Sequence, residues 1–153
     1  MGVGRHQRSR DDWETPEHIY RPYADRYRIV LDVCANARNH KAPFWISKRE
    51  NALIREWEGV WWMNPPYGRG IIGKWVQKAH QEAQAGRWGV ALLPAFTGNG
   101  WWIDTVWRHY RQNVEWVRKR IHFVGARYNA PFWSAVVVFR ACPQPIHLEE
   151  RGC

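Results

Sequence analysis

The sequence has few cysteines, and none of them forms a pattern that binds a metal or builds a disulfide framework. Cys34, Cys142 and Cys153 are odd in number and widely spaced, and no C-x-x-C pair occurs. This pattern predicts no metal site and fits a reducing cytoplasm. Residues 1–10 are polar and basic, so they do not resemble a signal peptide. No apolar run approaches the roughly 20 residues of a membrane span, so we expect no membrane partner.

Positive charge and tryptophan are what the sequence has in excess. The chain has 153 residues, a net charge of +9 and twelve tryptophans. A chain of this length suits one compact domain that buries about two-thirds of its surface, so it needs no covalent staples. Residues 108–127 hold six basic residues and one acidic residue. Clustered positive charge beside aromatic residues predicts a polyanionic partner such as nucleic acid, although charge alone also serves solubility.

The two ends of the chain differ from the middle in composition. Residues 1–10 predict a disordered basic arm, and residues 142–153, with two prolines and two glutamates, predict a flexible tail. Residues 11–141 contain no internal repeat and no linker, so we expect them to form a single domain.

Apolar and amphipathic segments alternate along this domain. Thr15 before Pro16 is typical of a helix start with a hydroxyl cap, and we expect that helix to reach about residue 27. Apolar residues recur on one face of residues 70–85, where Gly86 ends the predicted helix. A further helix is expected at 101–111, and residues 49–57 are ambiguous. Strands are expected at 28–34, 43–47, 59–63, 89–93, 114–117, 121–124 and 135–139.

This alternation predicts an α/β fold with a mostly parallel, twisted sheet and helices on both faces. The last strands follow one another without a helix between them, which predicts an antiparallel edge. Ligands bind such sheets at the carboxyl ends of the strands. The candidate sites are therefore the turns after Asp32 and after Met63.

The predicted strand at 59–63 runs directly into Asn64-Pro65-Pro66-Tyr67. An exocyclic amine on an aromatic ring is a poor nucleophile, because its lone pair is delocalised into the ring. Acceptors on its N–H bonds stabilise the charge that develops when it attacks a sulfonium methyl group. The Asn64 oxygen is one such acceptor and the Pro65 carbonyl can be the second, in a loop that two prolines restrict.

Tyr67 adds a flat face on which a flipped base can stack. A strand-ending turn uses the same residue types, so the tetrapeptide alone predicts only a site for a planar amino nitrogen.

The sequence resembles the small phage-type DNA N-6-adenine methyltransferases over about residues 12–140. This resemblance implies a Rossmann-like methyltransferase fold and S-adenosylmethionine as cofactor. It also implies double-stranded DNA as partner, with adenine flipped toward Asn64 and methylated at N6, in a phage- or prophage-encoded protein of the bacterial cytoplasm. The blocks that carry it are Trp13-Glu14-Thr15-Pro16, Leu31-Asp32-Val33-Cys34-Ala35, Asn39, Asn51-Ala52-Leu53 through Trp57, Trp62-Met63-Asn64-Pro65-Pro66-Tyr67-Gly68, Trp75-Val76, Leu92-Leu93-Pro94-Ala95, Arg120-Ile121-His122-Phe123 and Ala130-Pro131-Phe132.

The resemblance also implies cofactor contacts in three places: an N-terminal motif, the turn after the first strand, and a position near the adenosyl group. The turn lacks a G-x-G pattern, and the usual acidic residue near Leu53 appears as Asn51. Asp32 would also serve as a simple turn cap. The predicted cofactor residues are Trp13, Thr15, Pro16, Asp32, Cys34, Ala35, Asn36, Glu50 and Asn51.

Nucleic-acid contacts are expected from Trp101, by stacking, and from Arg118, Lys119 and Arg120, by binding phosphates. Core packing and edge protection would use the same residue types. The same motif would also serve cytosine N4, an RNA adenine or a protein glutamine, and the positive charge favours nucleic acid. A third hypothesis, based on the missing glycines and on Asn51, is a non-catalytic nucleic-acid-binding relative.

Overall fold

The computed structural model describes residues 13–141, so the predicted arm and tail lie outside the described residues. Six strands form one sheet in the order β2-β1-β3-β4-β6-β5. Strands β2, β1, β3 and β4 are parallel, and β6 is antiparallel to both β4 and β5. The strands are β1 (Leu31–Asp32), β2 (Phe44–Trp45), β3 (Trp61–Met63), β4 (Gly89–Pro94), β5 (Val114–Trp116) and β6 (Ser134–Phe139).

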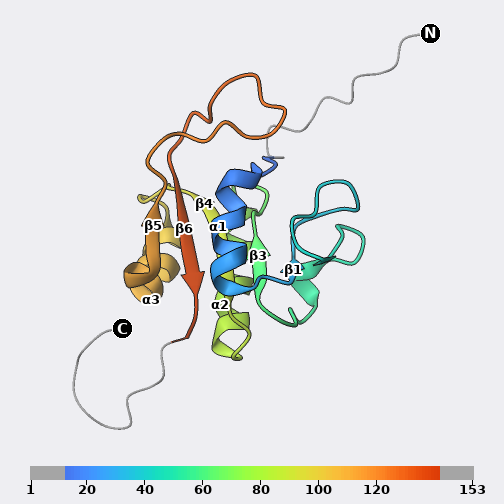
Figure 1. Cartoon of the computed structure of the whole chain (residues 1–153). Helices are drawn as coiled ribbons and strands as arrows, with labels where there is room; N and C mark the ends of the chain where they lie inside the picture. Colours follow the sequence, from blue (N-terminus) through green and yellow to red (C-terminus); the bar gives the residue numbers. More distant parts are fainter. Residues whose placement is uncertain (1–12, 142–153) are drawn as a thin grey trace.

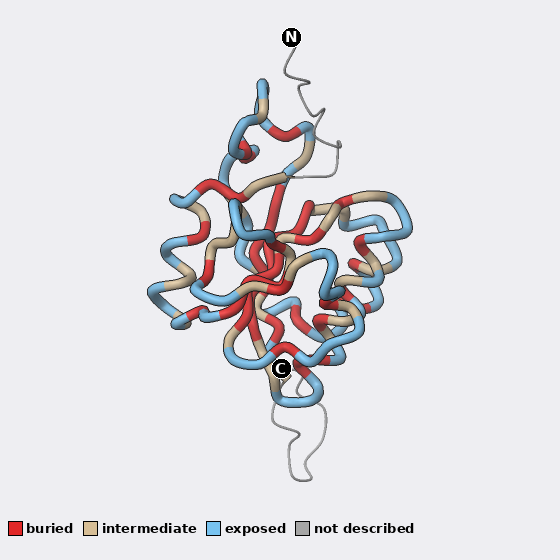
Figure 2. Tube along the Cα trace, turned by 90° about the vertical axis from the view of Figure 1, so that its right-hand side faces the viewer, coloured by how far each residue is buried: buried red, intermediate tan, exposed pale blue. Residues whose placement is uncertain are grey.

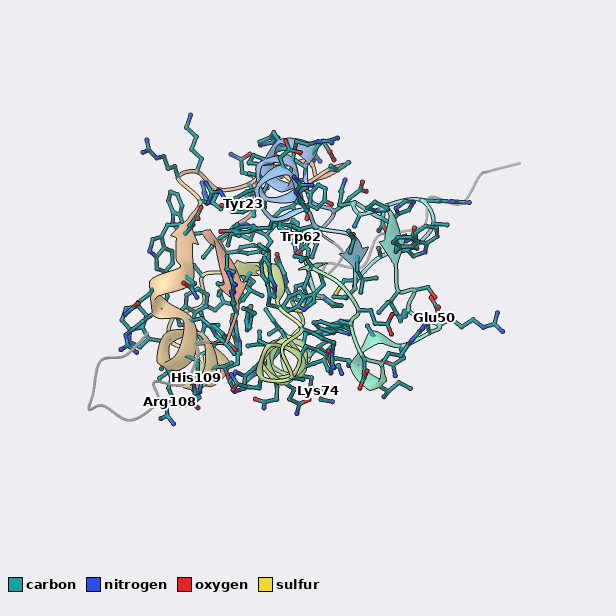
Figure 3. The ribbon with its side chains drawn as sticks, turned by 60° about the horizontal axis from the view of Figure 1, so that its bottom comes forward. Tyr23, Glu50, Trp62, Lys74, Arg108 and His109 are labelled. Atoms are coloured by element: carbon teal, nitrogen blue, oxygen red, sulfur yellow. The ribbon has the colours of Figure 1, made fainter. Side chains whose placement is uncertain are left out.

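Helices lie on both faces of this mostly parallel sheet (Figure 1). The helix α1 (Glu17–Tyr27) packs Tyr20 edge-on against Trp62, with ring centroids 5.2 Å apart. Figure 3 shows Tyr23 and Trp62 on this side, and α2 (Ile72–Gln84), with Lys74, on the other. A π-helical segment, η2 (Trp102–Trp107), continues into α3 (Arg108–Tyr110). Two short 3-10 turns are η1 (Ala52–Ile54) and η3 (Arg111–Asn113). None of the helices in residues 13–141 is long and apolar enough to cross a membrane.

The core lies between these layers, and Figure 2 shows buried strands surrounded by exposed loops. Helix α2 buries Ile72, Val76 and Ala79 on the predicted apolar face and ends before Gly86, whose φ is 84°. All six residues of β4 are buried. Gly89 in β4 is required by its neighbour, because a Cβ there would lie 2.1 Å from the Trp61 ring.

Several predicted elements differ from the structure in extent. The predicted strand 28–34 is reduced to β1, because Arg28 adopts a left-handed conformation (φ 54°) where α1 ends. The antiparallel pairing is present, but the reversed strand is β6, one position in from the edge. The ambiguous segment 49–57 contains only η1.

Residues 121–124 do not form the predicted strand. Ile121 and Phe123 are buried and alternate with exposed residues, which is the pattern that predicted a strand. Their backbone groups bond elsewhere: Val124 N–H donates to the Glu14 carbonyl at 3.0 Å, and Ala130 N–H to the Ile121 carbonyl at 2.8 Å. The segment therefore bonds to the N-terminal residues of the domain and pairs with no strand of the sheet.

The carboxyl ends of β1, β3 and β4 meet at one edge of the sheet. Residues 117–133 also lie at this edge, because they join the end of β5 to the start of β6, where Ser134 pairs with Pro94. In Figure 1 this long connection lies at the top of the molecule, close to the first described residues. The topology thus brings the predicted site residues together at the carboxyl ends of the parallel strands.

Candidate active site

Asn64 follows the last residue of β3 and is half-buried. Its side-chain nitrogen donates to the backbone carbonyl of Trp13 and to the Thr15 hydroxyl oxygen, the latter at 2.9 Å. Its side-chain oxygen accepts from the Tyr67 hydroxyl at 2.6 Å. A carboxamide has two N–H donors and one oxygen with two lone pairs. Both donors are therefore engaged, and the capacity left to Asn64 is that of an acceptor.

Tyr67 is only 7% exposed, and its hydroxyl lies between two acceptors. Besides Asn64, the Leu92 carbonyl lies 3.3 Å away. One O–H proton serves one acceptor well at a time, so a turn of this hydroxyl toward Leu92 frees the Asn64 oxygen. Burial raises the pKa of Tyr67 well above its usual value, which keeps the phenol protonated.

An aromatic cluster covers this site, made of Trp13, Tyr67, Phe96, Phe123 and Phe132. Phe132 is central: its ring centroid lies 5.5 Å from those of Trp13, Tyr67 and Phe96, each in an edge-on arrangement. Trp13 also lies 5.1 Å from Phe123. The cluster thus packs residues 13, 96, 123 and 132 around the Tyr67 ring, whose hydroxyl contacts Asn64.

The expected open face of Tyr67 is not present in this structure. The ring is buried, with Phe132 and Phe123 edge-on to it. A planar ring reaches Tyr67 only when these side chains shift. The motif could not predict this burial, because the residues that bury Tyr67 come from a segment about 60 positions further along the chain, and stacking on Tyr67 stays a prediction.

Thr15 also differs from its predicted role. The residue that caps α1 is Pro16, which makes no side-chain capping bond, and the Thr15 hydroxyl instead accepts from Asn64. Thr15 is 2% exposed. The sequence predicted a local cap because a hydroxyl before proline is typical of one. A contact with a residue 49 positions away determines its role here.

The N-terminal residues 13–15 join three loops at this edge. Trp13 and Thr15 hold Asn64, and the Glu14 carbonyl accepts from Val124 N–H at 3.0 Å. The Glu14 carboxylate also lies 3.6 Å from the Lys41 ammonium, in the loop after β1. These contacts fix the segment on three sides.

Asp32, the last residue of β1, is 4% exposed. Its carboxylate accepts from the backbone N–H of Cys34 at 3.2 Å and of Lys41 at 3.0 Å. Burial raises the pKa of Asp32 to about 6, although these backbone bonds oppose the shift. Burial likewise raises the pKa of the Cys34 thiol, so it is protonated and not a nucleophile. The Asp32 side chain holds the loop after β1 in place.

The family model described as DNA N-6-adenine-methyltransferase (Dam) matches residues 4–141 of the chain. The chain belongs to this methyltransferase family. It is also similar to the DNA N-6-adenine-methyltransferase of Haemophilus phage HP1 (strain HP1c1). The two are 30% identical over 119 residues, which cover 75% of this chain and 67% of the phage protein.

Other residues predicted to bind the cofactor of this methyltransferase family make loop-internal bonds. The Asn36 side chain accepts from Arg38 N–H at 2.8 Å, within its own turn. Glu50 accepts from the Ser47 hydroxyl and from Arg55, each at 2.8 Å. Asn51 caps η1 in a left-handed conformation (φ 56°), a position that asparagine and aspartate tolerate well. Ala35 and Pro16 are buried.

The predicted nucleic-acid residues lie at two places. Arg118, Lys119 and Arg120 are exposed and begin two residues after the end of β5, at the edge that holds Asn64. Trp101 is half-buried, edge-on to Trp102, with its indole N–H unpaired among the described residues. This placement gives a stacking role for Trp101 no support, and that role stays a prediction.

The sequence singled out Trp13 and Thr15 as cofactor residues, but their contacts with Asn64 were not predicted. The phenylalanines of the aromatic cluster were not predicted as site residues. Phe123 and Phe132 stand in the blocks that carry the family resemblance, and this was the available signal. Within residues 13–141 no group of three His, Cys, Asp or Glu side chains gathers as a metal site.

Proposed function

We propose that this chain transfers a methyl group from S-adenosylmethionine to N6 of adenine in double-stranded DNA, on a Rossmann-like methyltransferase fold. The observation that carries the proposal is the state of Asn64, whose two N–H groups are engaged and whose oxygen is available as an acceptor. An amino group such as adenine N6 offers the matching donor, whereas a keto oxygen does not. The family match and the phage relative are both named for adenine N6 in DNA, so neither favours another acceptor.

The residues at the ends of β1 and β3 fit S-adenosylmethionine by charge. When bound, this cofactor supplies a methyl group made electrophilic by its sulfonium. The half-buried Cys34 lies beside the Asn64 backbone, with the buried Asp32 carboxylate two residues before it, a lining that suits a cation. The Glu14–Lys41 pair offers one charge of each sign for the amino-acid end. Asp32, Cys34, Ala35 and Lys41 are the residues that we propose hold the cofactor.

The chemistry of the acceptor site follows from neutral groups. The Asn64 oxygen and the Pro65 carbonyl accept the two amino hydrogens and stabilise the positive charge that develops on nitrogen. Burial raises the pKa of Tyr67 and of Cys34, so neither is an anionic base at neutral pH. The rate enhancement is therefore expected from preorganised acceptors rather than from a charged base.

The same edge carries the proposed DNA contacts. Arg118, Lys119 and Arg120 suit phosphates, because they are exposed cations in a chain of net charge +9. Further along the same connection, Tyr128 is 69% exposed and the Arg127 guanidinium lies 5.2 Å from its ring centroid. This cation-aromatic pair suits stacking beside a flipped adenine.

The experiment compares wild type with Asn64→Ala, using tritiated S-adenosylmethionine and duplex DNA, single-stranded DNA, RNA or no nucleic acid. We expect N6-methyladenine in duplex DNA, lost in Asn64→Ala. Asn113→Ala is a matched control, because Asn113 precedes β5 at the opposite edge and should keep activity. Label in RNA or protein would overturn the substrate. Failure of the wild type to bind S-adenosylmethionine in calorimetry would favour a non-catalytic relative.

A further inference from the structure

An asparagine at an amine-binding site has an orientation problem that an aspartate does not have. The two ends of its carboxamide have nearly the same shape, but one end accepts and the other donates. A carboxamide flipped by 180° would present its N–H groups to an amino group, and the two would repel. An active site that uses Asn64 as an acceptor must therefore fix which end faces the base.

The contacts of Asn64 solve this problem. A backbone carbonyl only accepts, so the Trp13 carbonyl requires the nitrogen on its side. The Thr15 hydroxyl oxygen, 2.9 Å away, accepts from the same nitrogen and uses its second N–H. In this structure the Tyr67 hydroxyl donates to the oxygen end at 2.6 Å, but a hydroxyl can also accept and does not by itself select the orientation. A flipped amide would set its oxygen against the Trp13 carbonyl, a contact between two acceptors.

Water cannot reach the Asn64 nitrogen to take the place of the Thr15 hydroxyl, because Thr15 is only 2% exposed. Its segment is also held independently of Asn64. The Glu14 carbonyl accepts from Val124 N–H, and the Trp13 ring packs 5.1 Å from Phe123. The backbone that carries both acceptors of the Asn64 nitrogen, the Trp13 carbonyl and the Thr15 hydroxyl, is thus held in place by other contacts.

We propose that the Trp13 carbonyl selects the orientation of the Asn64 amide, and that Thr15 is a positioning residue that holds the nitrogen end by accepting its second N–H, so that the oxygen faces the reacting amine. This inference rests on the proposed function, and it departs from the cofactor contact that the family resemblance implies for Thr15. A cofactor contact changes the affinity for S-adenosylmethionine. A positioning residue changes the rate of transfer, because it acts on an interaction made with the reacting nitrogen.

The kinetic experiment uses Thr15→Val, which keeps the shape and removes the acceptor, and Thr15→Ser, which keeps the acceptor. Thr105→Val is the matched control, a buried threonine in η2. We expect Thr15→Val to lower kcat on duplex DNA by about 5- to 100-fold, the range for one stranded polar group, with KM for S-adenosylmethionine within about 2-fold. Thr15→Ser should remain within about 3-fold of wild type. A raised KM with unchanged kcat would overturn the proposal.

A second readout needs neither DNA nor cofactor. The side-chain amide signals of Asn64 in a 15N spectrum, identified by their loss in Asn64→Ala, should exchange slowly with water in wild type and in Thr15→Ser. They should exchange faster in Thr15→Val. If Thr15→Val does not fold, Thr15→Ser still decides, because fast exchange in that variant contradicts the proposal. A wild type that leaves DNA unmodified but protects the amide would reject the proposed substrate and retain the positioning of Asn64.

Discussion

For the substitution Asn64→Asp, acceptor strength and the geometry of this site predict opposite effects on activity. A carboxylate is a stronger acceptor for an amino group than an amide oxygen, so chemistry alone expects Asn64→Asp to keep or gain activity. The structure predicts the reverse. The second carboxylate oxygen would occupy the place of the Asn64 nitrogen, which donates to the Trp13 carbonyl and to the Thr15 hydroxyl. Thr15 can turn its proton toward that oxygen, but the carbonyl cannot.

The magnitude follows from these contacts. The substitution removes the bond to the Trp13 carbonyl and leaves a half-buried carboxylate oxygen facing it, which costs about 1–3 kcal/mol, as for one stranded polar group. At about 2–4 °C per kcal/mol for a domain of this size, Tm should fall by about 2–12 °C. The displaced acceptor should lower kcat by on the order of 10²- to 10³-fold.

The destabilisation caused by Asn64→Asp should increase with pH. The Trp13 carbonyl disfavours the charged form, so the pKa of the introduced carboxyl should be raised in the folded state. Its destabilisation is then full above the folded-state pKa and vanishes below the unfolded value of about 3.9. Urea unfolding at several pH values and methyl transfer to duplex DNA measure both effects. A variant with wild-type Tm and kcat would refute the amide orientation.

Three further predictions concern stability and DNA binding. Glu82→Gln should lower the free energy of unfolding, measured in urea, by about 3 kcal/mol, because Glu82 is 2% exposed and bonds two cationic side chains at 2.5 Å. The control Glu17→Gln removes an exposed ion pair and should lower it by less than about 1 kcal/mol. The pKa of Asp32, about 6, lets the folded state hold a proton that the unfolded state releases near 3.9. Between pH 4 and 7 wild type should therefore lose about 2 kcal/mol relative to Asp32→Asn, and parallel pH profiles would contradict this. Tyr128→Ala should weaken duplex binding about 10-fold, whereas Phe44→Ala, at the same 69% exposure on β2, should not.

Local patterns predicted the parts of this fold that depend on local forces. The apolar face of residues 70–85 and the buried run before Asn64 gave α2 and β3, because periodicity reports burial directly. Residues 121–124 show where this reasoning stops. Their alternation correctly indicated that Ile121 and Phe123 are buried, but it carries no information about the partner, which is the backbone of Glu14.

The candidate site divides in the same way. A motif after a predicted strand located Asn64, since strand ends are where such sheets bind ligands. The partners of Asn64 were not predictable, because they come from residues 49 and 51 positions earlier in the chain. Thr15 fits the local pattern of a helix cap, so the sequence suggested that role and not its contact with Asn64. The burial of Tyr67 by Phe132 was not predictable either, because the two residues are far apart in the chain.

These long-range contacts make the choice of asparagine at position 64 a structural one. Two acceptors, the Trp13 carbonyl and the Thr15 hydroxyl oxygen, face one end of this side chain. A residue that meets acceptors at one end and offers an acceptor at the other must carry both a donor and an acceptor, and asparagine does so without a charge. Aspartate would need a donor in place of the Trp13 carbonyl. The residue type at position 64 and the backbone path of residues 13–15 therefore depend on each other. A change in either one requires a change in the other.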